Sequence, residues 1–137
     1  HVLLATDRVE AMMATWTPQT WCAPHDHGGS VGGVRVLRGR ARHRVFQIEG
    51  EVLKLIREEL VEEGGILCCG PTLVHQMRSE GDVLVTLHMY AGPIDFMRVY
   101  QADRTYVVEG ECGAWVPEDQ PELVRQAHDG PRLAIPA

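Results

Sequence analysis

The stretch Pro24-His25-Asp26-His27-Gly28-Gly29 places two histidines two residues apart, after a proline and before two glycines. On an extended backbone this spacing turns both imidazoles to one side and Asp26 to the other. Neutral imidazole is the commonest side-chain ligand of first-row metals, so two rings on one face make half of a metal site. A His-x-His pair also occurs on ordinary surfaces, but the glycines here allow the chain to turn back sharply behind it.

Short runs of β-branched and apolar residues, separated by turn residues, extend from this stretch in both directions along the chain. We interpret as strands Glu10–Thr17, Gly33–Arg38, Arg40–Ile48, Val52–Leu60, Gly65–Cys69, Val83–Tyr90, Ile94–Tyr100 and Thr105–Val108. Gly39 and the segment Glu49-Gly50-Glu51 indicate tight hairpin turns. This pattern predicts an all-β sandwich or small barrel.

The end of the chain differs from the rest. Glu118–Ala127 is the one predicted helix, with Pro121 in its first turn. Asp129–Ala137 is predicted to be an extended or poorly ordered tail. We expect a barrel domain over residues 1–116 and a C-terminal extension over residues 117–137.

Composition excludes several classes of protein. The 137 residues suit one domain, and their 45% apolar and 23% charged content is ordinary for a globular chain. A net charge of −6 without a basic tract argues against nucleic-acid binding. No apolar run approaches the roughly 20 residues of a membrane helix, and no signal-peptide pattern opens the chain, so we expect a cytoplasmic protein. The chain starts at His1 without a methionine, and one expectation is a trimmed version of a longer protein.

The cysteines do not form a disulfide or zinc pattern. Two of the four, Cys68 and Cys69, are adjacent in an apolar run, and there is no Cys-x-x-Cys spacing. We interpret Cys22, Cys68, Cys69 and Cys112 as small buried side chains in a reducing compartment. Cys22 stands three residues before His25, so on a strand its side chain is expected to point to the opposite face.

An arginine row is the clearest charge pattern. Arg38, Arg40, Arg42 and Arg44 share one parity and would line one face of a strand. An anion-binding surface is one interpretation. We favour a solvated face opposite acidic residues of a neighbouring strand. Those acidic residues are Glu58, Glu59, Glu62 and Glu63.

Two later segments carry further candidate site residues. His75 follows a Gly-Pro turn and begins a strand, where it is either a third metal ligand or a buried core histidine. Thr86, His88 and Tyr90 alternate along one strand and therefore share a face. A hydroxyl, an imidazole and a phenol in a row can form a hydrogen-bonded relay, although a polar outer face explains the pattern equally well.

Taken in order, these residues resemble the cupin superfamily and, within it, the thiol dioxygenases typified by cysteine dioxygenase. The match covers roughly residues 1–108. It includes His25-Asp26-His27-Gly28-Gly29-Ser30, Val36-Leu37-Arg38-Gly39, His75, Leu87-His88-Met89-Tyr90-Ala91-Gly92-Pro93, Met97 and Tyr100. Cupins generally have a glutamate ligand where this chain has Gly32. The thiol dioxygenases lack that carboxylate and bind iron through three histidines.

The resemblance implies a cupin-type jelly-roll β-barrel with minor helical segments and an Fe(II) ion held by His25, His27 and His75. It also implies that Thr86, His88 and Tyr90 correspond to the family's Ser-His-Tyr relay. Animal members carry at the Gly32 position a cysteine crosslinked to the tyrosine, so this chain resembles a bacterial type. The arginine or glutamine that recognises the substrate carboxylate in this family would fall before His1.

The expected function is conversion of a small thiol, cysteine or a mercapto acid, and O2 to the sulfinic acid. Three neutral ligands leave the cation its full positive charge, which suits a thiolate. The alternatives are a metal-binding cupin without catalytic activity and a cupin enzyme acting on a non-thiol substrate. We expect no nucleic-acid or membrane partner and favour a monomer.

Overall fold

The computed structural model describes residues 1–109, 122 and 124–134, and these residues are almost entirely β-strand and turn. The strands are β1 Val2–Ala5, β2 Val9–Trp16, β3 Val31–Arg38, β4 Ala41–Glu49, β5 Val52–Val61, β6 Ile66–Cys69, β7 Val74–Ser79, β8 Leu84–Ala91, β9 Phe96–Gln101, β10 Arg104–Glu109, β11 Val124–Asp129 and β12 Arg132–Ala134. The all-β prediction is confirmed.

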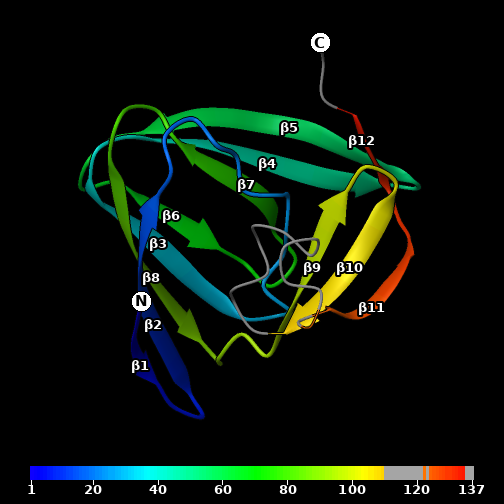
Figure 1. Ribbon diagram of the computed structural model, residues 1–137, viewed down its shortest axis with the longest axis horizontal. Helices are drawn as coiled ribbons and strands as arrows, with labels where there is room; N and C mark the ends of the chain where they lie inside the picture. The colour runs from blue at the N-terminus through cyan, green and yellow to red at the C-terminus, as the bar shows by residue number, and fades with distance from the viewer. Residues whose placement is uncertain (110–121, 123, 135–137) are drawn as a thin grey trace.

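Three sheets curl around a shared interior (Figure 1). One sheet has the strand order β1-β2-β8-β3-β6, a second has β12-β5-β4-β7, and a third has β11-β10-β9. Neighbouring strands are antiparallel except β12, which pairs in parallel with β5. The buried apolar side chains fill the interior. Its fully buried members include Val34, Val36, Leu84, Met97, Val99 and Val108.

Most of the predicted strands are present, and both predicted turns contain a glycine with positive φ, Gly39 at 83° and Gly50 at 60°. A Cβ at Gly39 would lie 2.0 Å from the Val83 carbonyl oxygen, so this turn also has no room for a side chain. Strand β1 was not predicted, and β7 was indicated only by His75.

The predicted helix Glu118–Ala127 is wrong where the structure describes it. Val124–Ala127 belong to β11 and pair with β10, so backbone pairing across the sheet overrides the local helical pattern. Residues 118–121 and 123 of that segment, and the predicted domain boundary at 116/117, lie outside the described residues. In the tail, Arg132–Ala134 are extended as expected. No helix among the described residues has the length and apolar character to cross a membrane.

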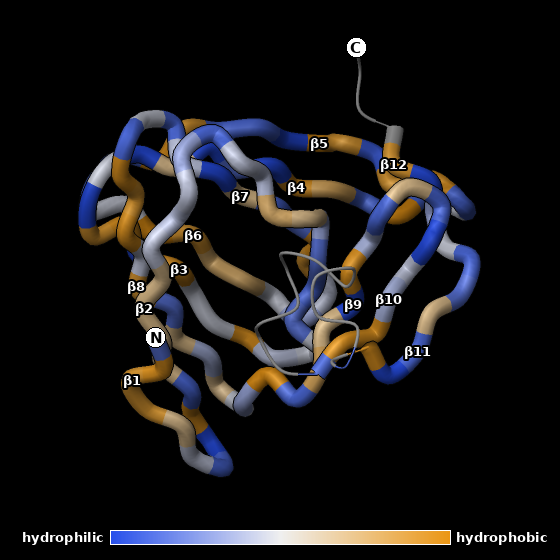
Figure 2. The backbone as a smooth tube through the Cα atoms, in the orientation of Figure 1, coloured by the Kyte–Doolittle hydropathy of each residue, from blue (hydrophilic) through white to orange (hydrophobic). Residues whose placement is uncertain are grey.

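The arginine row is divided by the turn at Gly39, because Arg38 ends β3 whereas Arg42 and Arg44 lie on β4. Hydrophilic residues gather along β4 and β5 (Figure 2). Arg42 and Arg44 both pair with Glu58, and Arg42 also pairs with Glu80. The interpretation of a paired acidic and basic face is therefore correct for Glu58.

The described cysteines are not all buried. Cys22 and Cys69 are buried, whereas Cys68 is exposed, so the prediction of a buried Cys68 is wrong. On β6, neighbouring side chains point to opposite faces, and only one of two adjacent cysteines can face the interior. Cys112 lies outside the described residues.

Candidate metal centre

The segment that carries His25 lies between two strands and completes the wall of the barrel. The backbone of His25 exchanges hydrogen bonds with His75 on β7, with N···O distances of 2.9 and 3.0 Å. On its other side, Asp26 N donates to the Arg98 carbonyl, and Tyr100 N donates to the Pro24 carbonyl, both on β9. These bonds set the segment against β7 and bring His25 and His75 side by side.

Asp26 holds the turn between the two histidines of the pair. Its carboxylate accepts hydrogen bonds from the backbone N–H of Gly28 and of Arg98, at 3.1 and 2.9 Å. The Arg98 guanidinium adds an ion pair at 2.9 Å. The carboxylate is therefore held against Arg98 on β9 and fixes the turn that follows it.

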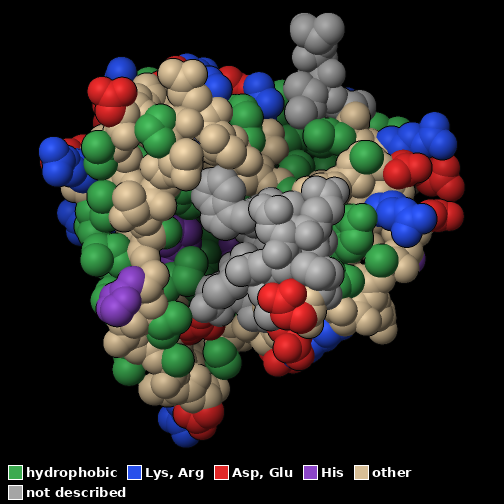
Figure 3. Space-filling view, viewed as in Figure 1, with side chains coloured by type: hydrophobic (Ala, Val, Ile, Leu, Met, Phe, Trp, Pro, Cys, Tyr) green, Lys and Arg blue, Asp and Glu red, His purple; other side chains and the backbone are tan. Residues whose placement is uncertain are grey.

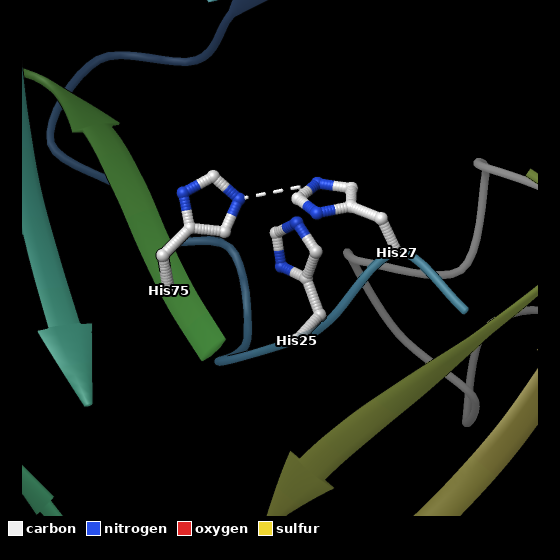
Figure 4. Close-up of side chains that lie close together, drawn as sticks. All are labelled: His25, His27 and His75. Atoms are coloured by element: carbon white, nitrogen blue, oxygen red, sulfur yellow. Dashed lines mark hydrogen bonds between the residues drawn. The ribbon is translucent and has the colours of Figure 1, made fainter. Parts of the chain in front are cut away.

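His25, His27 and His75 converge on one point (Figure 4). All three are buried, and one ring nitrogen from each lies within 4.8 Å of the others. The Nε2 atoms of His75 and His27 are 3.3 Å apart. Histidine side chains are visible at the bottom of a hollow in the face shown in Figure 3. The structure thus brings together the three residues that the sequence marked as ligands.

The three imidazoles are neutral at physiological pH. Burial lowers the pKa of His25 to about 4 and that of His27 to about 2, and it lowers the pKa of His75 well below its ordinary value. Neighbouring imidazoles act in the same direction on His27 and His75. Neutral imidazole is the form that binds metals, so the donor set suits a cation.

The spacing of the nitrogens also suits a metal ion. His25 Nδ1 lies 2.8 Å from the Ala23 carbonyl oxygen, which can only accept, so Nδ1 carries the proton and Nε2 presents its lone pair. Two nitrogens bound at about 2.1 Å to one ion are separated by roughly 3.0–3.4 Å, which includes the His75–His27 distance. His27 Nδ1 is buried and has no hydrogen-bond partner among the residues that the structure describes.

A second row of polar side chains lies beside this cluster. Thr86 Oγ1 is 2.8 Å from His88 Nε2, and His88 Nδ1 is 3.1 Å from the Tyr90 hydroxyl. All three are buried, so the row is not a polar outer face. The rings of Tyr90 and His27 are 5.0 Å apart, which places the row next to the histidine cluster. Burial lowers the pKa of His88 to about 4, so this imidazole is neutral too.

Two further residues contact the two clusters and were not singled out from the sequence. Trp16 Nε1 donates to Thr86 Oγ1 at 2.7 Å. His43 Nε2 lies 2.9 Å from His75 Nδ1, and His43 Nδ1 lies 3.0 Å from Glu59 Oε1. His43 stands between two arginines on a strand, and alternation could have indicated that it faces inward.

The predicted orientation of Cys22 is wrong. Its sulfur lies 3.9 Å from His25 Nδ1 and accepts a hydrogen bond from the Met77 backbone N–H. The prediction assumed a strand through residues 22–25, but the structure has no regular strand there. Burial raises the pKa of the Cys22 thiol to about 12, so it remains protonated beside the cluster.

No family model matches the sequence. A structure from Klebsiella pneumoniae subsp. pneumoniae, an uncharacterized conserved protein with a double-stranded β-helix domain, is 18% identical with a TM-score of 0.56 and covers 73% of this chain and 81% of its own. The oxalate decarboxylase–formate complex of Lactobacillus farciminis is 20% identical with a TM-score of 0.54 and covers 64% of this chain and 25% of its own.

Procruciferin, an 11S globulin from Brassica napus, is 13% identical with a TM-score of 0.59, covering 67% of this chain and 22% of its own. This chain therefore spans about a quarter of the decarboxylase and of the globulin. At these identities the similarity concerns the fold, which an enzyme and an 11S globulin share. The chain accordingly has the double-stranded β-helix fold of these structures and carries within it a buried site of three histidines suited to a metal ion.

Proposed function

We propose that this protein is a non-haem Fe(II) thiol dioxygenase that converts a small thiol and O2 to the sulfinic acid. The observation that carries the proposal is the adjacency of two buried arrays, the three neutral imidazoles and the Thr86–His88–Tyr90 row. Support for a thiol also comes from the ligands themselves, since three neutral donors leave the cation its full charge for an anionic thiolate.

His25, His27 and His75 would hold the ion. An Fe(II) ion bound there would supply a cationic centre for the thiolate and the redox chemistry with O2. The overall reaction, RSH + O2 → RSO2H, adds both oxygen atoms to sulfur, and the thiol proton is retained on the product acid. The protein needs no further reductant for this balance.

The Thr86–His88–Tyr90 row gives the site a positioned proton donor. Trp16 already donates to Thr86 Oγ1, which favours donation of the Thr86 hydroxyl proton to His88 Nε2. Neutral His88 then carries its proton on Nδ1 and donates it to the Tyr90 oxygen. In that arrangement Tyr90 uses its own hydroxyl proton to orient the substrate or to stabilise charge that develops on oxygen.

The same arrangement argues against one of the two alternatives. A cupin that only binds metal gains nothing from a buried tyrosine held by a histidine beside its ligands. A cupin enzyme that acts on a carbon substrate could share the three histidines, and only a substrate test separates it from a thiol dioxygenase.

The test is oxygen uptake by the Fe(II)-loaded protein with cysteine, 3-mercaptopropionate and other small thiols. We expect one sulfinate formed for each O2 consumed, with both product oxygens labelled from 18O2. Oxygen consumption that yields only disulfide, or metal binding without thiol oxidation above the rate of free iron, would reject the thiol dioxygenase proposal. The Tyr90→Phe variant keeps the ring and removes only the hydroxyl, so it is the matched control for the part that this hydroxyl takes in the reaction.

A further inference from the structure

A buried hydrogen-bonded chain runs from the surface to the metal ligand His75. Glu59 on β5 lies 3.0 Å from His43 Nδ1, and His43 Nε2 lies 2.9 Å from His75 Nδ1. His43 on β4 is only 1% exposed, whereas the Glu59 side chain is 36% exposed. Neither His43 nor Glu59 belongs to the three histidines that converge or to the Thr86–His88–Tyr90 row.

Sheet register places these side chains together. His43 is directly opposite Glu59 in the β4–β5 pair and directly opposite Met77 in the β4–β7 pair. His75 stands two residues before Met77 on β7, so it is the diagonal neighbour of His43 on the same face. Arg42 and Arg44 alternate to the other face of β4, where they pair with Glu58.

The direction of the protons in this chain follows from its outer end. A carboxylate can only accept, so His43 must donate from Nδ1 to Glu59. The His43 side chain is only 1% exposed, and removal from water disfavours the doubly protonated, charged imidazole, so its Nε2 is an acceptor. His75 must therefore donate from Nδ1, which leaves the lone pair of its Nε2 facing His27 Nε2, 3.3 Å away.

We infer that His43 and Glu59 are positioning residues that fix the tautomer and the ring orientation of His75, so that its Nε2 is always available to the metal. The inference rests on the proposed metal centre. Without this chain, His75 could place its proton on Nε2, inside the cluster, where the proton would exclude a cation. Metal-binding histidines commonly have such a partner on their other nitrogen, and its loss lowers metal affinity about 10- to 100-fold.

The first experiment reads the tautomer in the metal-free protein at neutral pH. Long-range 1H–15N correlation spectra distinguish Nδ1–H from Nε2–H imidazole, and we expect His75 to be the Nδ1–H form. His43→Phe keeps a ring of similar size and removes both nitrogens, so the preference should be lost. His43→Gln retains an acceptor oxygen close to the position of Nε2 and should restore it. A wild-type His75 with its proton on Nε2 would overturn the inference.

The second experiment measures metal affinity by competition with a chelator. We expect affinity about 10- to 100-fold lower for His43→Phe and within a few-fold of wild type for His43→Gln. Glu59→Ala should weaken binding, whereas Glu58→Ala, the matched control on the same strand, should not, because Glu58 pairs with Arg42 and Arg44 on the other face. Equal affinity of His43→Phe and wild type, in a variant that melts normally, would contradict the positioning role.

The two experiments separate this inference from the proposed function. A wild-type protein with the Nδ1–H form of His75 that binds metal but oxidises no thiol would reject the proposed function alone. A protein that binds iron and oxidises thiols, but in which His43→Phe changes neither the tautomer nor the affinity, would reject the inference alone.

Discussion

Acid should unfold the metal-free protein in a pH range where the histidines, and not the carboxylates, titrate. Burial lowers the pKa of His25 and His88 to about 4 and that of His27 to about 2, from an ordinary value of 6.5. A group whose pKa is lower in the folded state takes up a proton on unfolding. The stability that it contributes is complete above pH 6.5 and is lost as pH falls from there toward the folded-state value.

The size of the effect follows from those values. Between about pH 7.5 and pH 5, an unfolded histidine becomes almost fully protonated while each of these three folded ones stays mostly neutral, which costs about 2 kcal/mol per residue. Three such residues together cost about 6 kcal/mol, and a domain of this size is stabilised by only about 5–15 kcal/mol. Burial lowers the pKa of His43 and His75 as well, and both add to the loss.

Urea unfolding in the presence of a chelator, repeated at steps from pH 7.5 to pH 5, measures this dependence. The free energy of unfolding should fall by several kcal/mol over the range. In His88→Gln the fall should be smaller by about 2 kcal/mol. His128→Gln is the control, since His128 is exposed on β11. A wild-type protein whose free energy of unfolding does not change over this pH range would refute the claim that these imidazoles are buried and neutral. A His88→Gln variant with the same pH dependence of stability as the wild type would refute it as well.

Three further predictions concern the metal and the tyrosine. His75→Ala should lose most bound iron and all oxygen uptake, and full iron occupancy by elemental analysis would contradict its role as a ligand. Tyr90→Phe should keep its iron while turnover falls on the order of ten- to a thousandfold; an unchanged rate with the best thiol would show that the hydroxyl takes no part. Intact mass should equal the sequence mass with all four thiols alkylated after denaturation, because Gly32 lies opposite Tyr90 and has no sulfur to crosslink. A mass low by two hydrogens that resists reduction would instead implicate Cys69, which pairs with Gly32 from the other side.

Much of the fold could be predicted because alternation and turn glycines are local signals. They predicted the β3–β4 and β4–β5 hairpins and the strand that carries Tyr90. Strand β7 was harder, since five of its six residues are buried and polar ones such as Gln76 are among them. A strand that is covered on both faces shows no alternation of polar and apolar residues. The error at Val124–Ala127 has a different origin. These residues pair with β10, a segment distant in the sequence, and local helix propensity does not reveal that pairing.

In the candidate site, too, relations within one segment could be predicted and relations between distant segments could not. Spacing within one segment predicted that His25 and His27 act together and that Thr86, His88 and Tyr90 form a row. Nothing local connects His75 to His25; the resemblance to the thiol dioxygenases linked them, and the bridge between β7 and the segment at His25 brings them into contact. Trp16 reaches Thr86 only because β2 pairs with β8.

The glutamate behind His43 depends on a single extra residue in β5. Counting back from the turn, where Glu49 is opposite Val52, a regular hairpin would set His43 opposite Glu58 and Arg44 opposite Arg57. The register shifts between Val45 and Phe46, so His43 meets Glu59 and Arg44 meets Glu58. A bulge of this kind adds one residue to one strand and moves every later pair by one. It replaces an arginine–arginine pair with an ion pair on the outer face and places Glu59 behind the buried histidine. The parity of the arginines alone could not show this, because it does not reveal where the opposite strand gains a residue.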